Sequence, residues 1–131
     1  MSKPKKKKIN SRAKGCRGEL EFCEFLKRAE PEFFADAHRS QQHCGAKGGA
    51  ADITCTGLDE LGLYPEVKRV EAGNPYNWLE QARHDAAEQG RESAGFVAHK
   101  RNGKDWMIIM DAKEFFTLIK DVSAPVTLFR A

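Results

Sequence analysis

The sequence predicts an α/β domain built on one mixed β-sheet, with the element order α-β-β-β-α-β-β-α. Two observations support this fold class. Segments with apolar residues at helical spacing alternate with short runs rich in β-branched residues, an arrangement typical of helices packed against a sheet. The chain has 131 residues, enough for one domain with a single core and too few for two ordinary domains.

The first half of the chain predicts one helix followed by three strands. The helix covers residues 17–29, where apolar residues recur three and four positions apart, and it ends before a proline. We expect a short strand over residues 33–39, then a glycine-rich loop over residues 43–49. Segments 51–56 and 63–70 are rich in β-branched residues and end near glycines, so they are expected to pair as a hairpin.

The second half predicts a helix, a hairpin and a last helix. Asn74 before Pro75 is typical of a helix start, and this helix should end at Gly90. Strands over 94–100 and 106–110 are expected around an Asn-Gly turn. The second of these strands is apolar throughout, which predicts a strand covered on both faces.

The last helix is expected to begin after Asp111, with Glu114 completing a capping box. Its apolar positions recur at helical spacing and are expected to point inward. These positions are Phe115, Leu118, Ile119 and Val122.

Charge is distributed unevenly along the chain. Residues 1–18 carry eight basic side chains and no acidic one, whereas the remaining residues carry 14 basic and 19 acidic side chains. We therefore expect a disordered basic arm over residues 1–14, a folded domain over 15–122 and a C-terminal tail over 123–131.

Composition disfavours several classes of protein. No apolar stretch approaches the roughly 18 to 20 residues that a membrane span requires, and the basic N-terminal residues precede no apolar signal segment. We expect a cytoplasmic protein, in a bacterial, archaeal or phage-infected cell, with its four cysteines reduced. A zinc site is the alternative for these cysteines, although their spacings match no common zinc finger. It would draw on Cys16, Cys23, His38, His43 and Cys44.

Two carboxylates on the expected hairpin suggest a cation site. Glu66 and Lys68 leave their strand on the same side, but with 12 Glu and 13 Lys in the chain about one Glu-x-Lys is expected by chance. Asp52 starts the preceding strand after a stretch of small residues. Because neighbouring carboxylates repel, such a pair favours a hard divalent cation such as Mg²⁺ or Mn²⁺. Glu19, on the apolar face of the first helix, offers a third carboxylate.

Each residue also has an ordinary interpretation. Glu19 could stabilise the positive end of its helix, and Asp52 could be a turn residue. Lys68 could be a solvated surface charge. The combination of the three with Glu66, in this order and on these elements, is what favours a site.

Taken together, these residues resemble the PD-(D/E)xK nuclease superfamily, and within it the archaeal-type and phage Holliday junction resolvases. The resemblance spans about residues 14–120 and departs from the family pattern at Ala51, where a proline is common. It implies a restriction-endonuclease-like core and a metal-dependent endonuclease of DNA recombination and repair. It further implies that Asp52, Glu66 and the Val67 carbonyl hold Mg²⁺ or Mn²⁺, with Glu19 completing the ligand set directly or through water.

The resemblance also implies roles for residues around the metal. Lys68 would orient or deprotonate the attacking water, and Ser40 and Gln81 are minor catalytic candidates. The substrate would be branched or duplex DNA, most directly a four-way junction cut by a homodimer. Basic side chains are expected to contact DNA phosphates. They are Lys5, Lys6, Lys7, Lys8, Arg12, Lys14, Arg17, Arg39 and Lys47.

Two alternatives stay open at this point. The protein could cut simple duplex DNA as a restriction-type or repair-type nuclease. It could also be a non-catalytic nucleic-acid-binding protein that uses a nuclease-like fold as a platform.

Overall fold

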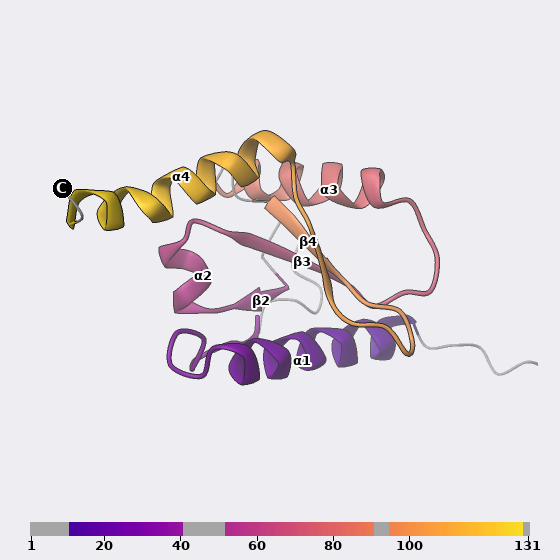
Figure 1. Cartoon of the computed structure of the whole chain (residues 1–131). Helices are drawn as coiled ribbons and strands as arrows, with labels where there is room; N and C mark the ends of the chain where they lie inside the picture. The colour runs from indigo at the N-terminus through magenta and orange to yellow at the C-terminus, as the bar shows by residue number, and fades with distance from the viewer. Residues whose placement is uncertain (1–10, 41–51, 91–94, 130–131) are drawn as a thin grey trace, which may run out of the picture.

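The structure, a computed structural model of the whole chain, describes residues 11–40, 52–90 and 95–129 (Figure 1). The α/β class is confirmed, and the observed order contains one helix more than expected. The elements are α1 (Ser11–Ala29), β1 (His38–Arg39), β2 (Ile53–Thr54), α2 (Thr56–Glu60), β3 (Tyr64–Lys68), α3 (Pro75–Glu88), β4 (Gly95–His99), β5 (Met107–Ile109) and α4 (Ala112–Phe129).

The main sheet is mixed and has the strand order β3-β4-β5. Strands β3 and β4 are parallel and are joined by the crossover helix α3, while β4 and β5 are antiparallel. In the ladders, Glu66 lies opposite Val97 and Ala98 lies opposite Ile108. Strands β1 and β2 form a separate antiparallel pair. Helices α1 and α3 lie on opposite sides of the main sheet (Figure 1).

The core lies between α1 and one face of the main sheet. Phe22 and Leu26 of α1 are buried against Phe96 and Ala98 of β4. The Trp106 ring, just before β5, packs on the Phe22 ring with a centroid distance of 4.9 Å. Buried side chains from α1 and β4 thus join into one hydrophobic cluster, as expected for a domain of this size.

The opposite face of β4 packs closely on α3. A Cβ built on Gly95 would lie 2.6 Å from the Ala82 carbonyl oxygen, so only glycine allows this helix and strand to approach so closely. The Trp78 ring lies 4.7 Å from the His99 ring, between centroids. Gly95, Val97 and His99 therefore face α3, since alternate residues of a strand share a face.

The start of α3 confirms the sequence prediction. The Asn74 side-chain oxygen accepts a hydrogen bond from the Tyr76 backbone N–H at 3.0 Å, and Pro75 opens the helix. The strands expected over 94–100 and 106–110 are also present, as β4 and β5.

The expected hairpin of segments 51–56 and 63–70 is wrong. Strand β2 pairs with β1 instead, and α2 separates it from β3. Helix α2 begins at Thr56 because the Asp36 carboxylate accepts hydrogen bonds from the Thr56 backbone N–H, at 3.0 Å, and from its hydroxyl. These bonds hold the pKa of Asp36 below its usual range. A cap supplied from 20 residues upstream turns the expected end of a strand into a helix.

Several element boundaries also differ from the prediction. Helix α1 begins at Ser11, so the last residues of the expected disordered arm are helical, and residues 1–10 lie outside the described residues. The strand expected over 33–39 is confined to His38–Arg39. Helix α4 continues to Phe129, beyond the expected domain boundary at residue 122.

The orientation of α4 contradicts the expectation that its apolar residues point inward. Phe115, Ile119 and Val122 are about half exposed, and only Leu118 of the four is partly buried. Strand β5 is not covered on both faces either, because Met107 and Ile108 are more than half exposed. Helical spacing identified the apolar stripe correctly, but spacing alone does not show what packs against it.

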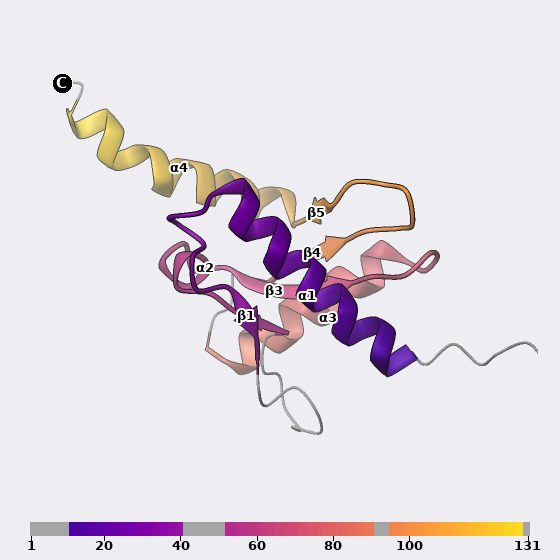
Figure 2. The same ribbon diagram turned by 90° about the horizontal axis from the view of Figure 1, so that it is seen from below.

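Helix α4 is attached to the domain at its first turn. The Asp111 carboxylate accepts hydrogen bonds from the backbone N–H groups of Lys113 and Glu114, which confirms the predicted N-cap. The capping box itself is not formed, because the Glu114 side chain turns to α3 instead of to the Asp111 N–H. The Glu114 carboxylate pairs with the Arg83 guanidinium of α3 at 3.0 Å. From this base α4 extends beyond the edge of the sheet (Figures 1 and 2).

Within the described ranges, none of the helices combines the length and the apolar character that crossing a bilayer requires.

Candidate metal centre

Asp52 lies immediately before β2 and connects this strand to β3. Its side chain is buried, and its Oδ2 atom accepts a hydrogen bond from the Val67 backbone N–H at 2.8 Å. Strands β2 and β3 form no ladder with each other, so this side-chain contact takes the place of strand pairing. The carboxylate is thereby held against the outer edge of β3.

The Val67 carbonyl is directed toward the same edge. In a strand, the backbone groups of alternate residues point to the same neighbour. The Lys68 carbonyl accepts from the Lys100 N–H on the β4 side, at 3.1 Å. The backbone groups of Val67 therefore point the other way, as the hydrogen bond of its N–H to Asp52 already indicates. This edge of β3 presents a carbonyl oxygen beside a carboxylate.

Glu66 has a strongly raised pKa. Burial, together with the negative charge of Asp52, raises the pKa of the Glu66 carboxyl to about 8, against the opposing effect of Lys68. Asp85 and Glu19 raise it further, by smaller amounts. A buried carboxylate beside a second one resists ionisation unless a cation compensates the charge. The site therefore carries an excess of negative charge when both acids are ionised.

Lys68 shares the face of Glu66. Because Glu66 lies opposite Val97 and Lys68 opposite His99, both side chains leave β3 on the side of α3. This placement agrees with the prediction that the acid and the ammonium group leave the strand on the same side. It also explains the influence of Asp85, which lies on α3.

Glu19 approaches from the α1 side and is already paired. Its side chain is buried, and its Oε2 atom accepts a hydrogen bond from the Arg39 Nε atom of β1 at 2.8 Å. The Arg39 Nη2 atom also contacts the Cys16 Sγ atom at 3.0 Å. Since α1 begins at Ser11, Glu19 lies about two turns into the helix, and the interpretation as a first-turn acid is wrong. Its charge is the smallest of the named influences on Glu66.

The two minor catalytic candidates, Ser40 and Gln81, contact different residues. The Ser40 backbone N–H donates to the Asp52 carbonyl at 3.1 Å, and the Ser40 and Thr54 hydroxyls are 3.0 Å apart. The Gln81 amide donates to Asp85 at 2.8 Å on the exposed surface of α3. Ser40 thus adjoins the backbone of Asp52, whereas Gln81 contacts Asp85, whose charge acts on Glu66.

Asp85 and the role of Arg39 as partner of Glu19 were missed by sequence reasoning. Asp85 is four residues after Gln81, a spacing that places both on one side of a helix, which was the available signal. No comparable signal links Arg39 to Glu19, because 20 residues separate them and only the packing of β1 on α1 brings them together.

Few of the residues that are predicted to contact DNA have side chains within the described part of the structure. Arg17 is exposed on α1 and Arg39 is bound to Glu19. The other candidates lie outside the described residues, or in the first turns of α1, where only the backbone is described. They are Lys5, Lys6, Lys7, Lys8, Arg12, Lys14 and Lys47.

The described residues of the alternative zinc site give it little support. Burial raises the pKa of the Cys23 thiol to about 11, which disfavours the thiolate that binds zinc. Cys16 contacts Arg39, and the His38 ring bonds the Asp36 carbonyl. His43 and Cys44 lie outside the described residues.

In the described ranges, three His, Asp or Glu donors come within 4.8 Å of one another only at His84, Asp85 and Glu88, an exposed group on α3. Glu19, Asp52 and Glu66 do not form such a group of three. Their chemistry nevertheless suits Mg²⁺, which is held by one or two carboxylates and keeps several waters. Asp52, Glu66 and the Val67 carbonyl offer only hard oxygen donors, and the raised pKa of Glu66 indicates a charge that a cation would relieve. Comparison of the chain with protein-family models, with curated proteins and with solved structures found no match.

Proposed function

We propose that the protein is a metal-dependent, structure-selective DNA endonuclease that hydrolyses phosphodiester bonds in four-way junctions. The main support is the pair of Asp52 and Glu66, in which burial and a neighbouring charge raise the pKa of Glu66 to about 8 beside Lys68. Acids whose pKa is shifted by burial together with a specific charged neighbour are concentrated at functional sites.

The residues at and around the edge of β3 would have different roles in this reaction. Asp52, Glu66 and the Val67 carbonyl would hold Mg²⁺ or Mn²⁺, which, when bound, offsets charge on the phosphate and eases deprotonation of water. Lys68 lies on the same face as Glu66. As an ammonium ion it would orient the attacking water, and only as a neutral amine would it accept the proton of that water. Glu19, paired with Arg39, supports the site from α1 rather than offering an uncompensated carboxylate.

Selectivity for junctions depends on the resemblance given above and on symmetry. A four-way junction presents two equivalent strands, and a twofold homodimer would place one site at each. The basic N-terminal residues would add contacts to DNA phosphates, which an otherwise acidic domain needs to approach DNA.

Cleavage of a synthetic four-way junction in the presence of Mg²⁺ tests the proposal. We expect Asp52→Asn and Glu66→Gln to reduce the cleavage rate by roughly 1,000-fold, because each removes a charged metal ligand. Glu80→Gln replaces an exposed acid of α3, is the matched control and should cut as the wild type does. Equal cutting by all four proteins would refute the assignment of the site.

A linear duplex of the same sequence, assayed in parallel, separates the remaining possibilities. Preferential cutting of the junction supports the resolvase, and equal cutting of both substrates indicates a duplex nuclease. Binding of DNA without cleavage, and without Mn²⁺ binding in calorimetry, indicates the non-catalytic platform.

The basic arm gives a separate prediction. Replacing Lys5, Lys6, Lys7 and Lys8 with Gln should weaken DNA binding and flatten its salt dependence, by about 0.9 log-log units for each phosphate that the arm no longer neutralises. Substitution is preferable to deleting residues 1–14, because Ser11 already belongs to α1. Fluorescence anisotropy across a salt series measures the slope, and an unchanged slope would contradict the predicted role of the arm. Calorimetric Mn²⁺ binding should be unaffected.

A further inference from the structure

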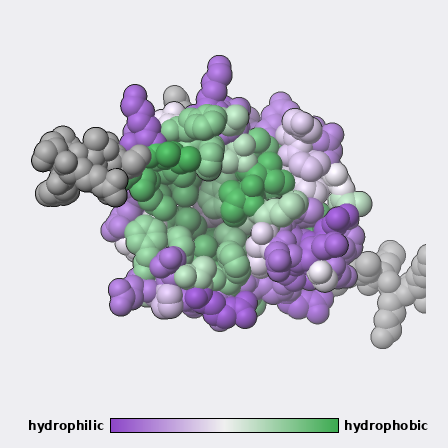
Figure 3. Space-filling view, viewed as in Figure 1, coloured by the Kyte–Doolittle hydropathy of each residue, from purple (hydrophilic) through white to green (hydrophobic). Residues whose placement is uncertain are grey.

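The edge of the main sheet opposite the candidate metal centre exposes many apolar side chains. On β5, Met107 is 53% and Ile108 is 56% exposed. On α4, Phe115, Phe116 and Val122 are 45%, 67% and 52% exposed. Figure 3 shows an extended apolar area that reaches from α4 toward α1. We call the exposed apolar residues of these two elements the β5–α4 surface.

We propose that the β5–α4 surface is the interface through which two copies of this chain form a twofold homodimer. This inference deepens the proposed function, on whose twofold arrangement its biological use rests. Three features favour a second copy as the partner: the edge strand, the area exposed and the charges that flank it.

Strand β5 is the outer strand of the main sheet. Among the described residues, β4 pairs with one of its sides and no strand pairs with the other. An exposed edge strand is a template for pairing with another chain. When such a strand pairs antiparallel with its own copy, the two are related by a twofold axis, which closes the assembly at two chains. The result would be a continuous sheet with β5 of each copy at its centre.

Both faces of β5 are open to such a partner. Ile108 lies opposite Ala98 and shares the α1 face of the sheet, while Met107 lies opposite His99 on the α3 face. Neither α1 nor α3 buries these side chains, since both remain more than half exposed. Helix α4 follows β5 directly, so its apolar residues would pack beside the paired strands.

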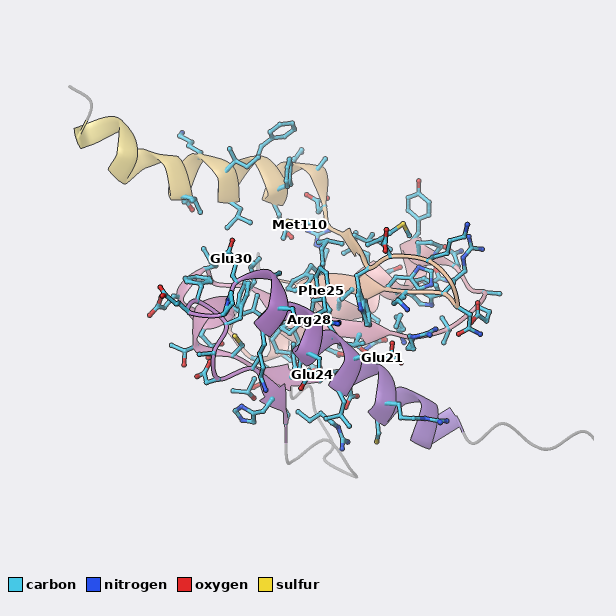
Figure 4. All side chains as sticks on the ribbon, turned by 60° about the horizontal axis from the view of Figure 1, so that its bottom comes forward. Glu21, Glu24, Phe25, Arg28, Glu30 and Met110 are labelled. Atoms are coloured by element: carbon cyan, nitrogen blue, oxygen red, sulfur yellow. The ribbon has the colours of Figure 1, made fainter. Side chains whose placement is uncertain are left out.

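The area agrees with what a dimer requires. With 150 to 250 Å² for a large side chain, the exposed fractions of Met107, Ile108, Phe115, Phe116 and Val122 amount to roughly 500 Å². This already approaches the largest apolar patch usual on a monomer, and a standard interface buries about 800 Å² on each partner. Further surface for such an interface lies next to it. A groove of about 770 Å³ along α1, lined by Leu20, Phe25 and Trp106 among others, adjoins β5 (Figure 4).

The flanking charges favour a protein partner over a lipid surface. Helices that lie on membranes carry many Lys and Arg residues on the polar face. The described part of α4 has Lys113 and Lys120 but also Glu114 and Asp121. The groove along α1 mixes Arg28 and Lys100 with Glu21, Glu24 and Asp105 in the same way. An apolar centre surrounded by a polar rim is typical of protein–protein interfaces, and charges of both signs let two copies of the same surface pair with each other.

Pairing through β5 also leaves the candidate metal centre accessible. Asp52 contacts the outer edge of β3, and β4 separates β3 from β5. The two sites of a dimer would therefore lie at opposite ends of the joined sheet, and neither would be covered by the partner chain.

Light scattering after size exclusion, on the full chain with chelator and without DNA, measures the mass. We expect about twice 14.7 kDa for the wild type at micromolar concentration. Phe116→Glu and Ile108→Lys each place a charge on the β5–α4 surface and should weaken dimerisation by at least about 30-fold. Tyr76→Glu is the matched control, because Tyr76 is a large aromatic residue of α3, 84% exposed, and its replacement should leave the dimer intact.

Far-UV circular dichroism verifies that each variant is folded. A wild type that stays monomeric at about 100 μM overturns the proposal, because a standard interface binds far more tightly. Dimers that persist in both surface variants overturn it equally. Neither DNA nor a divalent cation is present, so a monomeric result leaves the assignment of Asp52 and Glu66 unaffected, and an inactive but dimeric protein refutes only the nuclease.

Discussion

Replacing Glu66 with Gln is expected to stabilise the metal-free protein at pH 8 by a few kcal/mol. Burial and Asp52 raise the pKa of Glu66 from 4.5 to about 8, so the folded state binds a proton that the unfolded state releases. The stability that comes from the protonated form is fully present below about pH 4.5 and is lost as the pH rises to about 8. The wild type should therefore lose up to about 4 kcal/mol over this range, and Glu66→Gln should not.

Urea denaturation in the presence of chelator, at half-unit steps from pH 5 to pH 8.5, measures this difference. Glu80→Gln, which replaces an exposed acid of α3, should follow the wild-type curve. Adding Mn²⁺ at about 100 times its Kd should restore about 2.7 kcal/mol to the wild type and nothing to Glu66→Gln. If the unfolding free energies of wild type and Glu66→Gln change in parallel with pH, Glu66 is not the acid whose ionisation destabilises the folded state.

Replacing Arg39 with Ala is expected to cost about 3–5 kcal/mol of unfolding free energy. The variant leaves the buried Glu19 carboxylate without the guanidinium that donates to it at 2.8 Å. Removing one member of a buried ion pair is costly because the remaining charge stays desolvated. Chemical denaturation at pH 7 gives the loss.

Two further variants test the cause. In the Arg39→Ala background, Glu19→Gln should recover part of the loss, since a neutral amide is cheaper to bury than a carboxylate. Lys27→Ala breaks an exposed pair with Glu24, 4.0 Å apart on α1, and should cost at most about 1 kcal/mol. Equal losses in Arg39→Ala and Lys27→Ala would mean that water reaches Glu19 and that the pair is not a buried one.

Local chemistry made much of the fold predictable. The start of α3 at Asn74 and Pro75 and the cap at Asp111 depend on neighbouring residues, and both are present. Helix α2 was missed because its start depends on Asp36, which lies 20 residues before Thr56 in the chain. The outward direction of α4 was missed for a related reason. A repeating apolar pattern defines a stripe, but its burial depends on which elements lie opposite.

In the candidate site too, features that depend on neighbouring residues were predictable and features that depend on distant residues were not. Glu66 and Lys68 share a face because the strand alternation of two residues requires it, and this was predictable. That Asp52 lies beside them was predicted correctly for an incorrect reason. The expected hairpin is absent, and a hydrogen bond from the Val67 N–H to the Asp52 side chain brings β2 to β3 instead. The pairing of Glu19 with Arg39 depends on tertiary packing and could not be read locally.

The hydrogen bond between Asp52 and Val67 affects how natural selection would act on this chain. Asp52 secures β2 to β3 in addition to any role with a metal, so a related chain without the proposed activity would still be selected to keep an acceptor there. Glu66, whose burial raises its pKa, contributes strain rather than support and would be free to change. In sequences derived from a common ancestor, retention of Asp52 alone would therefore indicate only that the fold is conserved, whereas retention of Glu66 would favour the proposed chemistry.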